Sequence, residues 1–196
     1  MSAPAKINFK MYQGSTFSEV LRWEGSEKVY KPISAITKSA PLVVTATAHG
    51  VPVEWRVKFT NIAGMTDLNS SEVYHQVTDV TANSLTINAV NSLGFKEYIS
   101  GGIVEYNKPI DLTGFTARMQ IRAKLEDTAI IETLTTENSK LVIDNVKKNI
   151  TILIPATTTE AYKFSTAVYS LELISSGGYV TPLASGTITL VKEVTR

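Results

Sequence analysis

Cysteine is absent from the 196-residue chain, and histidine occurs only twice. Without cysteine the chain forms no disulfide, no thiolate nucleophile and no thiolate zinc site. Two histidines cannot supply a three-histidine metal site. These absences exclude thiol redox chemistry, cysteine-protease chemistry, and zinc sites built from thiolates or from three histidines.

The chain also lacks an excess of charge, since 19 Lys and Arg residues face 18 Asp and Glu residues, for a net charge of +1. Nucleic acids and anionic membranes attract clusters of Lys and Arg, so we expect neither nucleic-acid binding nor membrane insertion. No run approaches the ~18 apolar residues of a membrane-spanning helix, and residues 1–10 show no signal-peptide pattern. We therefore expect a soluble protein made in a cytoplasm.

What the chain does contain is apolar–polar alternation with a period of two, which is typical of half-buried strands. In residues 116–123, Ala117, Met119, Ile121 and Ala123 share one face. Frequent Thr, Val and Ile favour strands further, because their branched Cβ suits a pleated surface. The sequence predicts an all-β protein. The same alternation predicts buried positions at Trp55, Val57, Phe59, Ile150, Ile152, Ile154, Tyr169, Leu171, Leu173, Ile188 and Leu190.

Turn residues separate the predicted strands. Residues 175–178 read Ser-Ser-Gly-Gly and predict a hairpin, because glycine supplies the positive φ of tight turns. Residues 144–149 predict a second reversal. Residues 157–164 are the one segment with a helical pattern, and a threonine is expected to cap it.

The amino-acid composition of the chain changes over residues 34–108, which are enriched in Ala, Asn, Thr and Val. Pro32 and Pro109 mark the two junctions, and proline favours extended or turn connections. The flanks, 1–33 and 109–196, have the strand count and spacing of one β-sandwich. We expect a discontinuous β-sandwich domain with a small β-barrel-like domain, 34–108, inserted in one of its loops.

Neither histidine has the neighbours that catalysis or metal binding requires. His49 follows a predicted strand and precedes Gly50, and no acidic residue lies close to it in the sequence. A metal ligand or a base is conceivable there, but a turn residue bonded to local backbone fits better. His75 is expected to share one strand face with Val73 and Val77 and to be partly buried with its hydrogen bonds satisfied.

Other catalytic patterns are missing as well. The sequence has no Gly-x-Ser-x-Gly elbow, no phosphate-binding glycine loop, no dinucleotide fingerprint and no calcium loop. Carboxylates occur singly, so a glycosidase pair would have to be assembled from distant strands. We predict no catalytic residue, no cofactor and no metal, and we predict that the protein is not an enzyme.

One polar face is a candidate interface. Arg118, Gln120 and Arg122 follow one another on the outer side of a predicted strand. A guanidinium group binds carboxylates through two parallel hydrogen bonds, so the face could dock a partner protein or an anionic sugar. An ordinary solvated surface is the alternative. Trp23 and Trp55 could stack on sugars, but their apolar neighbours favour core positions.

The segment 34–108 resembles a small β-module that is common in virion proteins of tailed bacteriophages. The module is related in fold to the first catalytic-cysteine half-domain of ubiquitin-activating enzymes. Three motifs carry the likeness: Thr-Ala-His-Gly at 47–50, Ile-Ala-Gly-Met-Thr-Asp-Leu-Asn at 62–69 and Ser-Gly-Gly at 100–102. No ubiquitin chemistry is implied, because the chain lacks cysteine.

The flanks are similar to immunoglobulin-like proteins encoded among phage tail-tip, collar and baseplate genes. The segments that carry this likeness are 9–17, 110–122, 134–138, 150–154 and 169–173. The resemblance also suggests that residues 31–33 and 108–110 are the two sides of one interrupted loop.

Together the two resemblances imply a non-enzymatic structural component of a phage virion, built into the tail tip, collar or baseplate. Its expected partners are other tail or baseplate proteins and copies of itself, arranged in a ring if the contact closes. The alternative is a carbohydrate-binding adhesin module that contacts the host surface, and a glycosidase is a more remote third reading.

Overall fold

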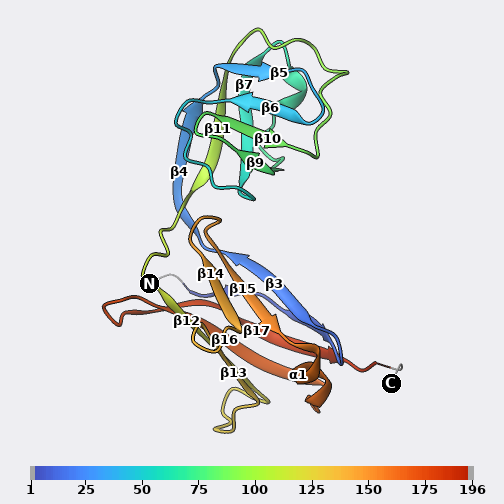
Figure 1. Ribbon diagram of the computed structural model, residues 1–196, viewed down its shortest axis with the longest axis vertical. Coiled ribbons are helices and arrows are strands. Elements are labelled where there is room, and N and C mark those ends of the chain that lie inside the picture. The colour runs from blue at the N-terminus through green and yellow to red at the C-terminus, as the bar shows by residue number, and fades with distance from the viewer. Residues whose placement is uncertain (1–2, 194–196) are drawn as a thin grey trace. The chain divides into compact units, whose positions relative to one another are not determined.

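Two compact units make up the computed structural model, which describes residues 3–193 (Figure 1). The sandwich unit comprises residues 1–23, 111–145 and 149–196, and the insert unit comprises residues 24–110 and 146–148. Strands dominate both units, which confirms the all-β prediction.

The larger sheet of the sandwich unit has six strands. Its order is β1-β17-β16-β12-β13, and β2 also pairs with β17. β1 and β2 run parallel to β17, whereas the other pairings are antiparallel. The bounds are β1 Ala5–Lys6, β2 Phe9–Tyr12, β12 Thr116–Arg122, β13 Glu132–Thr135, β16 Thr166–Ile174 and β17 Val180–Val191.

The smaller sheet has three strands in the order β14-β15-β3. β14 spans Leu141–Asp144, β15 spans Asn149–Ile154 and β3 spans Phe17–Arg22. The predicted reversal at 144–149 joins β14 to β15, and the predicted hairpin at 175–178 joins β16 to β17. In that second turn Gly178 has a φ of +78°, a value that suits glycine.

The inner faces of these two sheets supply the core of the sandwich unit. Ala117, Met119 and Ile121 of β12 are buried, as the alternation predicts. Ala123 is exposed, because β12 ends at Arg122 and the pleat no longer sets its direction. The other predicted core positions in this unit are also buried: Ile150, Ile152, Ile154, Tyr169, Leu171, Leu173, Ile188 and Leu190.

The short helix α1 spans Ala156–Ala161, so it begins one residue before the predicted segment 157–164 and ends three residues before that segment does. Its N-cap is Pro155 and makes no side-chain hydrogen bond, so the predicted threonine cap is wrong. The Thr159 hydroxyl instead donates to the backbone oxygens of Ser15 and Ala156, at 2.8 and 2.9 Å. Buried Gln13 donates to the oxygens of Glu160 and Tyr162, which fastens the helix to the residues after β2.

The insert unit contains two four-stranded sheets, ordered β5-β6-β10-β9 and β4-β11-β7-β8. A short 3₁₀ helix, η1 (Thr66–Leu68), follows β7. Neither sheet closes into a barrel over the described strands, so the insert is sandwich-like rather than barrel-like. The bounds are β4 Glu24–Pro32, β5 Ala35–Thr37, β6 Leu42–Thr45, β7 Arg56–Ala63, β8 His75–Gln76, β9 Asp79–Val80, β10 Ser84–Ile87 and β11 Ser100–Pro109.

Large apolar side chains between these two sheets form the insert core. Trp55, Val57 and Phe59 are fully buried, as their alternation predicts. Val73 is 51% exposed, because it precedes the two-residue strand β8 instead of belonging to it. His75 is half-buried, and the two residues therefore do not share one face of a strand.

The sequence places the domain boundaries at 33/34 and 108/109, whereas the compact units divide at 23/24 and 110/111. The reason is the long strand β4, which pairs with β11 from Glu24 to Pro32. β11 also pairs with β7, so β4 is part of the insert sheet. Within this pairing Pro32 lies opposite Ile103 and Pro109 lies opposite Glu24, so residues 31–33 and 108–110 are not opposite one another.

Candidate functional site

The polar face predicted from the sequence lies on the outer side of the six-stranded sheet. Arg118, Gln120 and Arg122 alternate along β12 with its buried residues. Arg118 is exposed, and the other two are half-buried. Cross-strand pairing places Glu172 of β16 opposite Arg118 and Ser170 opposite Gln120.

The two arginines of this face are already bonded within the chain. Arg118 Nη2 donates to Glu172 Oε2 at 2.8 Å. Arg122 Nη1 donates to the backbone oxygen of Asp127 at 2.6 Å, and its Nη2 donates to Gln120 Oε1 at 3.0 Å. An incoming carboxylate would therefore have to displace internal acceptors, which lowers the gain from binding.

A hollow of about 270 Å³ lies at this face and is lined by Arg118, Gln120, Ser170 and Glu172. Its lining is polar and contains one cation and one anion that neutralise each other. The arrangement suits a hydrated surface or the rim of a protein contact better than an anion site. The structure thus brings Gln120 next to both arginines: it lines the hollow with Arg118 and accepts a hydrogen bond from Arg122, which also bonds the loop that follows β12.

A second hollow, of about 470 Å³, lies beside α1 and was not predicted from the sequence. Its lining is Ile131, Glu132, Thr158, Ala161, Tyr162, Lys163 and Phe164. The Tyr162 hydroxyl is buried and makes no hydrogen bond of ordinary geometry. Burial, followed by the charge of the Glu132 carboxylate, raises the pKa of Tyr162 well above its usual value. The neutral phenol is therefore the stable form.

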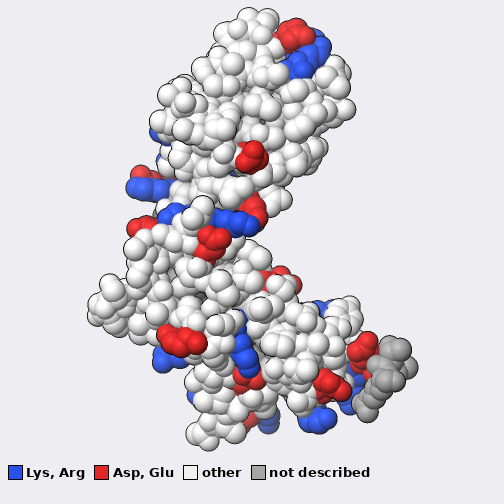
Figure 2. All heavy atoms as spheres, viewed as in Figure 1, with Lys and Arg blue, Asp and Glu red and all other residues white. Residues whose placement is uncertain are grey.

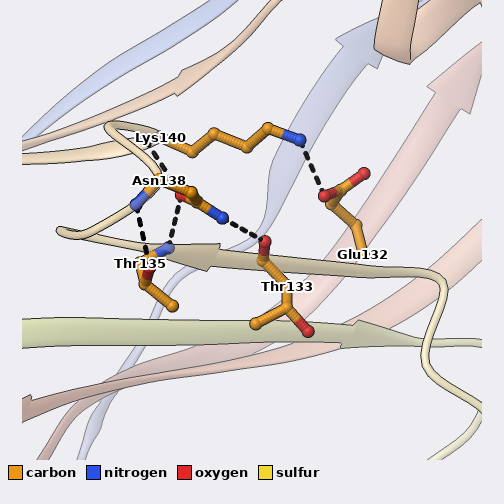
Figure 3. A network of polar contacts seen from close by, with 5 residues as sticks. All are labelled: Glu132, Thr133, Thr135, Asn138 and Lys140. Carbon is orange, nitrogen blue, oxygen red and sulfur yellow. Dashed lines mark hydrogen bonds and ion pairs between the residues drawn. The ribbon is translucent and has the colours of Figure 1, made fainter.

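Glu132, which lines this hollow, also belongs to a network of polar contacts, drawn in Figure 3. Lys140 Nζ donates to Glu132 Oε1 at 2.8 Å. Asn138 Oδ1 accepts from the backbone nitrogens of Thr135 and Lys140, and its Nδ2 donates to the oxygen of Thr133 at 2.9 Å. These bonds hold the turn between β13 and β14. The Glu132 carboxylate is thus engaged in a structural ion pair.

The two histidines also act as structural groups. His49 is buried; its Nδ1 accepts from the backbone nitrogen of Val51 at 3.0 Å, and its Nε2 lies 2.9 Å from the oxygen of Thr81. This is the backbone-bonded turn histidine that the sequence favours. His75 stacks on Phe59 with ring centroids 5.3 Å apart, and burial lowers its pKa.

Neither tryptophan offers an open stacking surface. Trp55 is buried in the insert core, and its Nε1 donates to the oxygen of Asn107 at 2.9 Å. Trp23 is half-buried instead of fully buried, with its ring edge-on to Phe115. The exposed aromatic residues are tyrosines, a feature that the sequence did not single out: Tyr12, Tyr30, Tyr74 and Tyr179.

Charges on the visible face are interspersed. Figure 2 shows acidic and basic side chains next to one another, without a broad area of one sign on the part of the chain that is described. Residues 3–193 contain no group of three or more acidic or histidine side chains placed to hold a metal ion. None of the helices in this range is long and apolar enough to cross a membrane.

Comparison with known proteins gives one family match. Residues 40–108 match the family model described as the ubiquitin-activating enzyme E1 FCCH domain. None of the curated proteins compared with the chain matches it. The matched segment lies inside the continuous stretch 24–110 of the insert unit. The insert is therefore similar to the FCCH domain, in agreement with the relation that its motifs suggest.

Proposed function

We propose that this chain is a non-enzymatic structural component of a tailed-bacteriophage virion, placed in the tail tip, collar or baseplate. It acts by oligomeric assembly and by contacts with neighbouring proteins. The motifs at 47–50, 62–69 and 100–102 support the virion assignment through their resemblance to phage modules. The FCCH match over 40–108 supports the fold relation on which that resemblance depends.

The observation that carries the assembly proposal is an exposed apolar surface on the sandwich unit. Val20 of β3 and Val142 of β14 flank Thr151 of β15 in one cross-strand row. Both valines are nearly half exposed, at 47% and 46%. Leu153, two residues from Thr151 on the same face, is 36% exposed. Apolar side chains grouped on a sheet face mark a surface that gains free energy when a partner covers it.

The strands that carry this surface also end their sheet. Within residues 3–193, β3 and β14 each pair with β15 alone. Their outer edges present backbone groups that a neighbouring strand could bind. We assign a second copy of the chain as the occupant, since a net charge of +1 allows copies to pack with little mutual repulsion. If each copy contacts the next in the same way, and the rotation from copy to copy brings the last copy back to the first, the copies form a ring.

Light scattering coupled to size-exclusion chromatography tests this assembly over a concentration series of the full chain. We expect an oligomer that dissociates on dilution. Val142→Lys places an ammonium group in the contact and is expected to give a monomer. Thr189→Lys, at an exposed position of β17 in the other sheet, is the matched control and should leave the oligomer intact.

The virion assignment needs a separate measurement. Gold-labelled antibody against the chain should mark tails in electron micrographs of the phage. A chain that stays monomeric at high concentration, and that the antibody does not find on tails, would contradict the proposal.

A further inference from the structure

A row of side chains crosses the outer face of the insert sheet β4-β11-β7-β8. Tyr30 of β4 lies opposite Glu105 of β11, and Glu105 lies opposite Lys58 of β7. The pairing of His75 with Val57 continues the row, because it places the preceding residue, Tyr74, next to Lys58. The row therefore reads Tyr30, Glu105, Lys58, Tyr74, with a tyrosine at each end.

Both tyrosine rings are accessible. Tyr30 is 57% exposed and Tyr74 is 38% exposed. Neighbouring strands lie about 4.8 Å apart, so three strand spacings separate the two rings by about 14 Å. Such spacing gives two aromatic contact points across the sheet, with polar groups between them.

Contacts within the sheet fix the orientation of Tyr74. The guanidinium carbon of Arg56 lies 4.6 Å from its ring centroid, and Lys58 Nζ lies 4.4 Å from it. Lys58 also donates to the backbone oxygen of Ser71. The two cations cover part of the ring and fix its orientation, so the ring loses less conformational freedom when a ligand packs on the part that stays exposed.

Most charged groups of this face are neutralised in pairs. Lys28 is paired with Glu105, and Arg56 is paired with Glu24 at 2.7 Å. Asn107 also donates to Glu24, at 2.9 Å. Lys58, which bonds the neutral backbone oxygen of Ser71, adds one positive charge, so the three cations and two carboxylates of this face sum to +1. Two of the three cations are already neutralised by these carboxylates, so a polyanion such as a nucleic acid or an acidic glycan gains little attraction from the single excess charge.

We infer that the Tyr30–Tyr74 face binds a neutral oligosaccharide. The C–H groups of a sugar ring carry partial positive charge and pack on the negative face of a tyrosine ring. Sugar hydroxyls both donate and accept, so they match the mixture of carboxylate, amide and ammonium groups between the rings. This activity belongs to the insert unit and is additional to the proposed assembly through the sandwich unit.

Binding of the full chain to an array of neutral hexose and N-acetylhexosamine oligosaccharides tests the inference. Hexagalacturonate and a single-stranded oligothymidylate on the same surface serve as acidic probes. We expect binding to at least one neutral oligosaccharide and little binding to the acidic probes. Preferential binding of the galacturonate or the oligonucleotide, or of no neutral sugar, would overturn it.

Variants locate the binding. Tyr30→Ala and Tyr74→Ala should each weaken binding about three- to tenfold, the range for one aromatic contact. Tyr179→Ala removes a tyrosine that is 59% exposed in the sandwich unit, and it should bind as the unaltered chain does. Unchanged thermal unfolding of all three variants would exclude loss of fold as the cause. Equal affinity of the Tyr30 and Tyr74 variants and the unaltered chain would contradict the assignment.

Discussion

Arg118 and Glu172 face each other across β12 and β16 on the outer side of the six-stranded sheet, joined by a hydrogen bond of 2.8 Å. Their side chains are 48% and 30% exposed. The pair neutralises one of the two arginines in a row that looks cationic in the sequence, while Arg122 bonds two uncharged oxygens.

A double-mutant cycle with Arg118→Ala and Glu172→Ala should give a coupling free energy below about 1 kcal/mol, because solvent screens exposed ion pairs. Urea denaturation of the two single variants and the double variant measures it. Added salt should reduce the coupling further. A coupling well above that range would mean that the pair is shielded, for example by a partner on this face.

Phe59→Ala should destabilise the insert unit by about 3–5 kcal/mol, because it opens a cavity in a fully buried core. Denaturation by guanidinium, followed by the fluorescence of buried Trp55 in a Trp23→Phe background, reports on this unit. Thr60→Ala, at the next and half-buried position of β7, is the matched control and should cost under about 1 kcal/mol. Similar losses in both variants would contradict the assigned core.

Gly186→Ala should destabilise the sandwich unit by about 1–3 kcal/mol, because the residue has no room for a side chain. A Cβ at Gly186 would lie 2.0 Å from the backbone oxygen of Ile7. The Ile7 backbone nitrogen donates to the oxygen of Ser185 at 3.0 Å, so the change should also disturb the parallel pairing of β1 with β17.

Thermal unfolding of Gly186→Ala and of Gly177→Ala provides the comparison. The nearest atom that a Cβ at Gly177 would meet lies 3.9 Å away, so the second variant should resemble the unaltered chain. Faster hydrogen exchange at Ile7 in the first variant would show that the pairing of β1 has loosened. Unaltered stability of Gly186→Ala would mean that the strand moves aside at little cost.

The stability of the insert unit should fall as the pH falls through the range of histidine titration. Burial lowers the pKa of His75 below the ordinary 6.5, so the unfolded chain binds a proton that the folded chain resists. Above the unfolded pKa both states are neutral and the effect vanishes.

Urea midpoints measured between about pH 7.5 and about pH 5 test the effect of this histidine. His75→Phe keeps an aromatic ring against Phe59 and removes the titration. The acid-induced loss of stability should therefore be smaller in the variant. An identical pH profile would assign the loss to other groups.

Short-range patterns in the sequence predicted much of the strand content. Alternation predicted the buried faces of β7, β12, β15, β16 and β17 correctly, because a pleated strand directs successive side chains to opposite sides. It failed where a strand ends, as at Ala123 and Val73. The helix cap was also mistaken, since Pro155 precedes the threonines and the Thr159 hydroxyl bonds elsewhere.

The candidate sites are formed by residues that lie far apart in the sequence and that only strand pairing and packing bring together. Arg118 could be placed on an outer face from local alternation, but its partner Glu172 is on another strand. The same holds for the hollow beside α1, which brings Ile131 and Glu132 together with residues of the segment 158–164. The aromatic residues Tyr162 and Phe164 after the helix were the one local signal that could have indicated it.

For this protein, the sequence by itself determined the strand character, the lack of thiol chemistry and the likeness of the insert to a known module. Each of these depends on residue type or on neighbours a few positions apart. The tertiary structure decided which strands pair. That pairing sets the first boundary between the two units, after Trp23, and forms the row from Tyr30 to Tyr74. Strand order joins residues far apart in the chain, and backbone hydrogen bonds between strands are formed alike by almost every residue type.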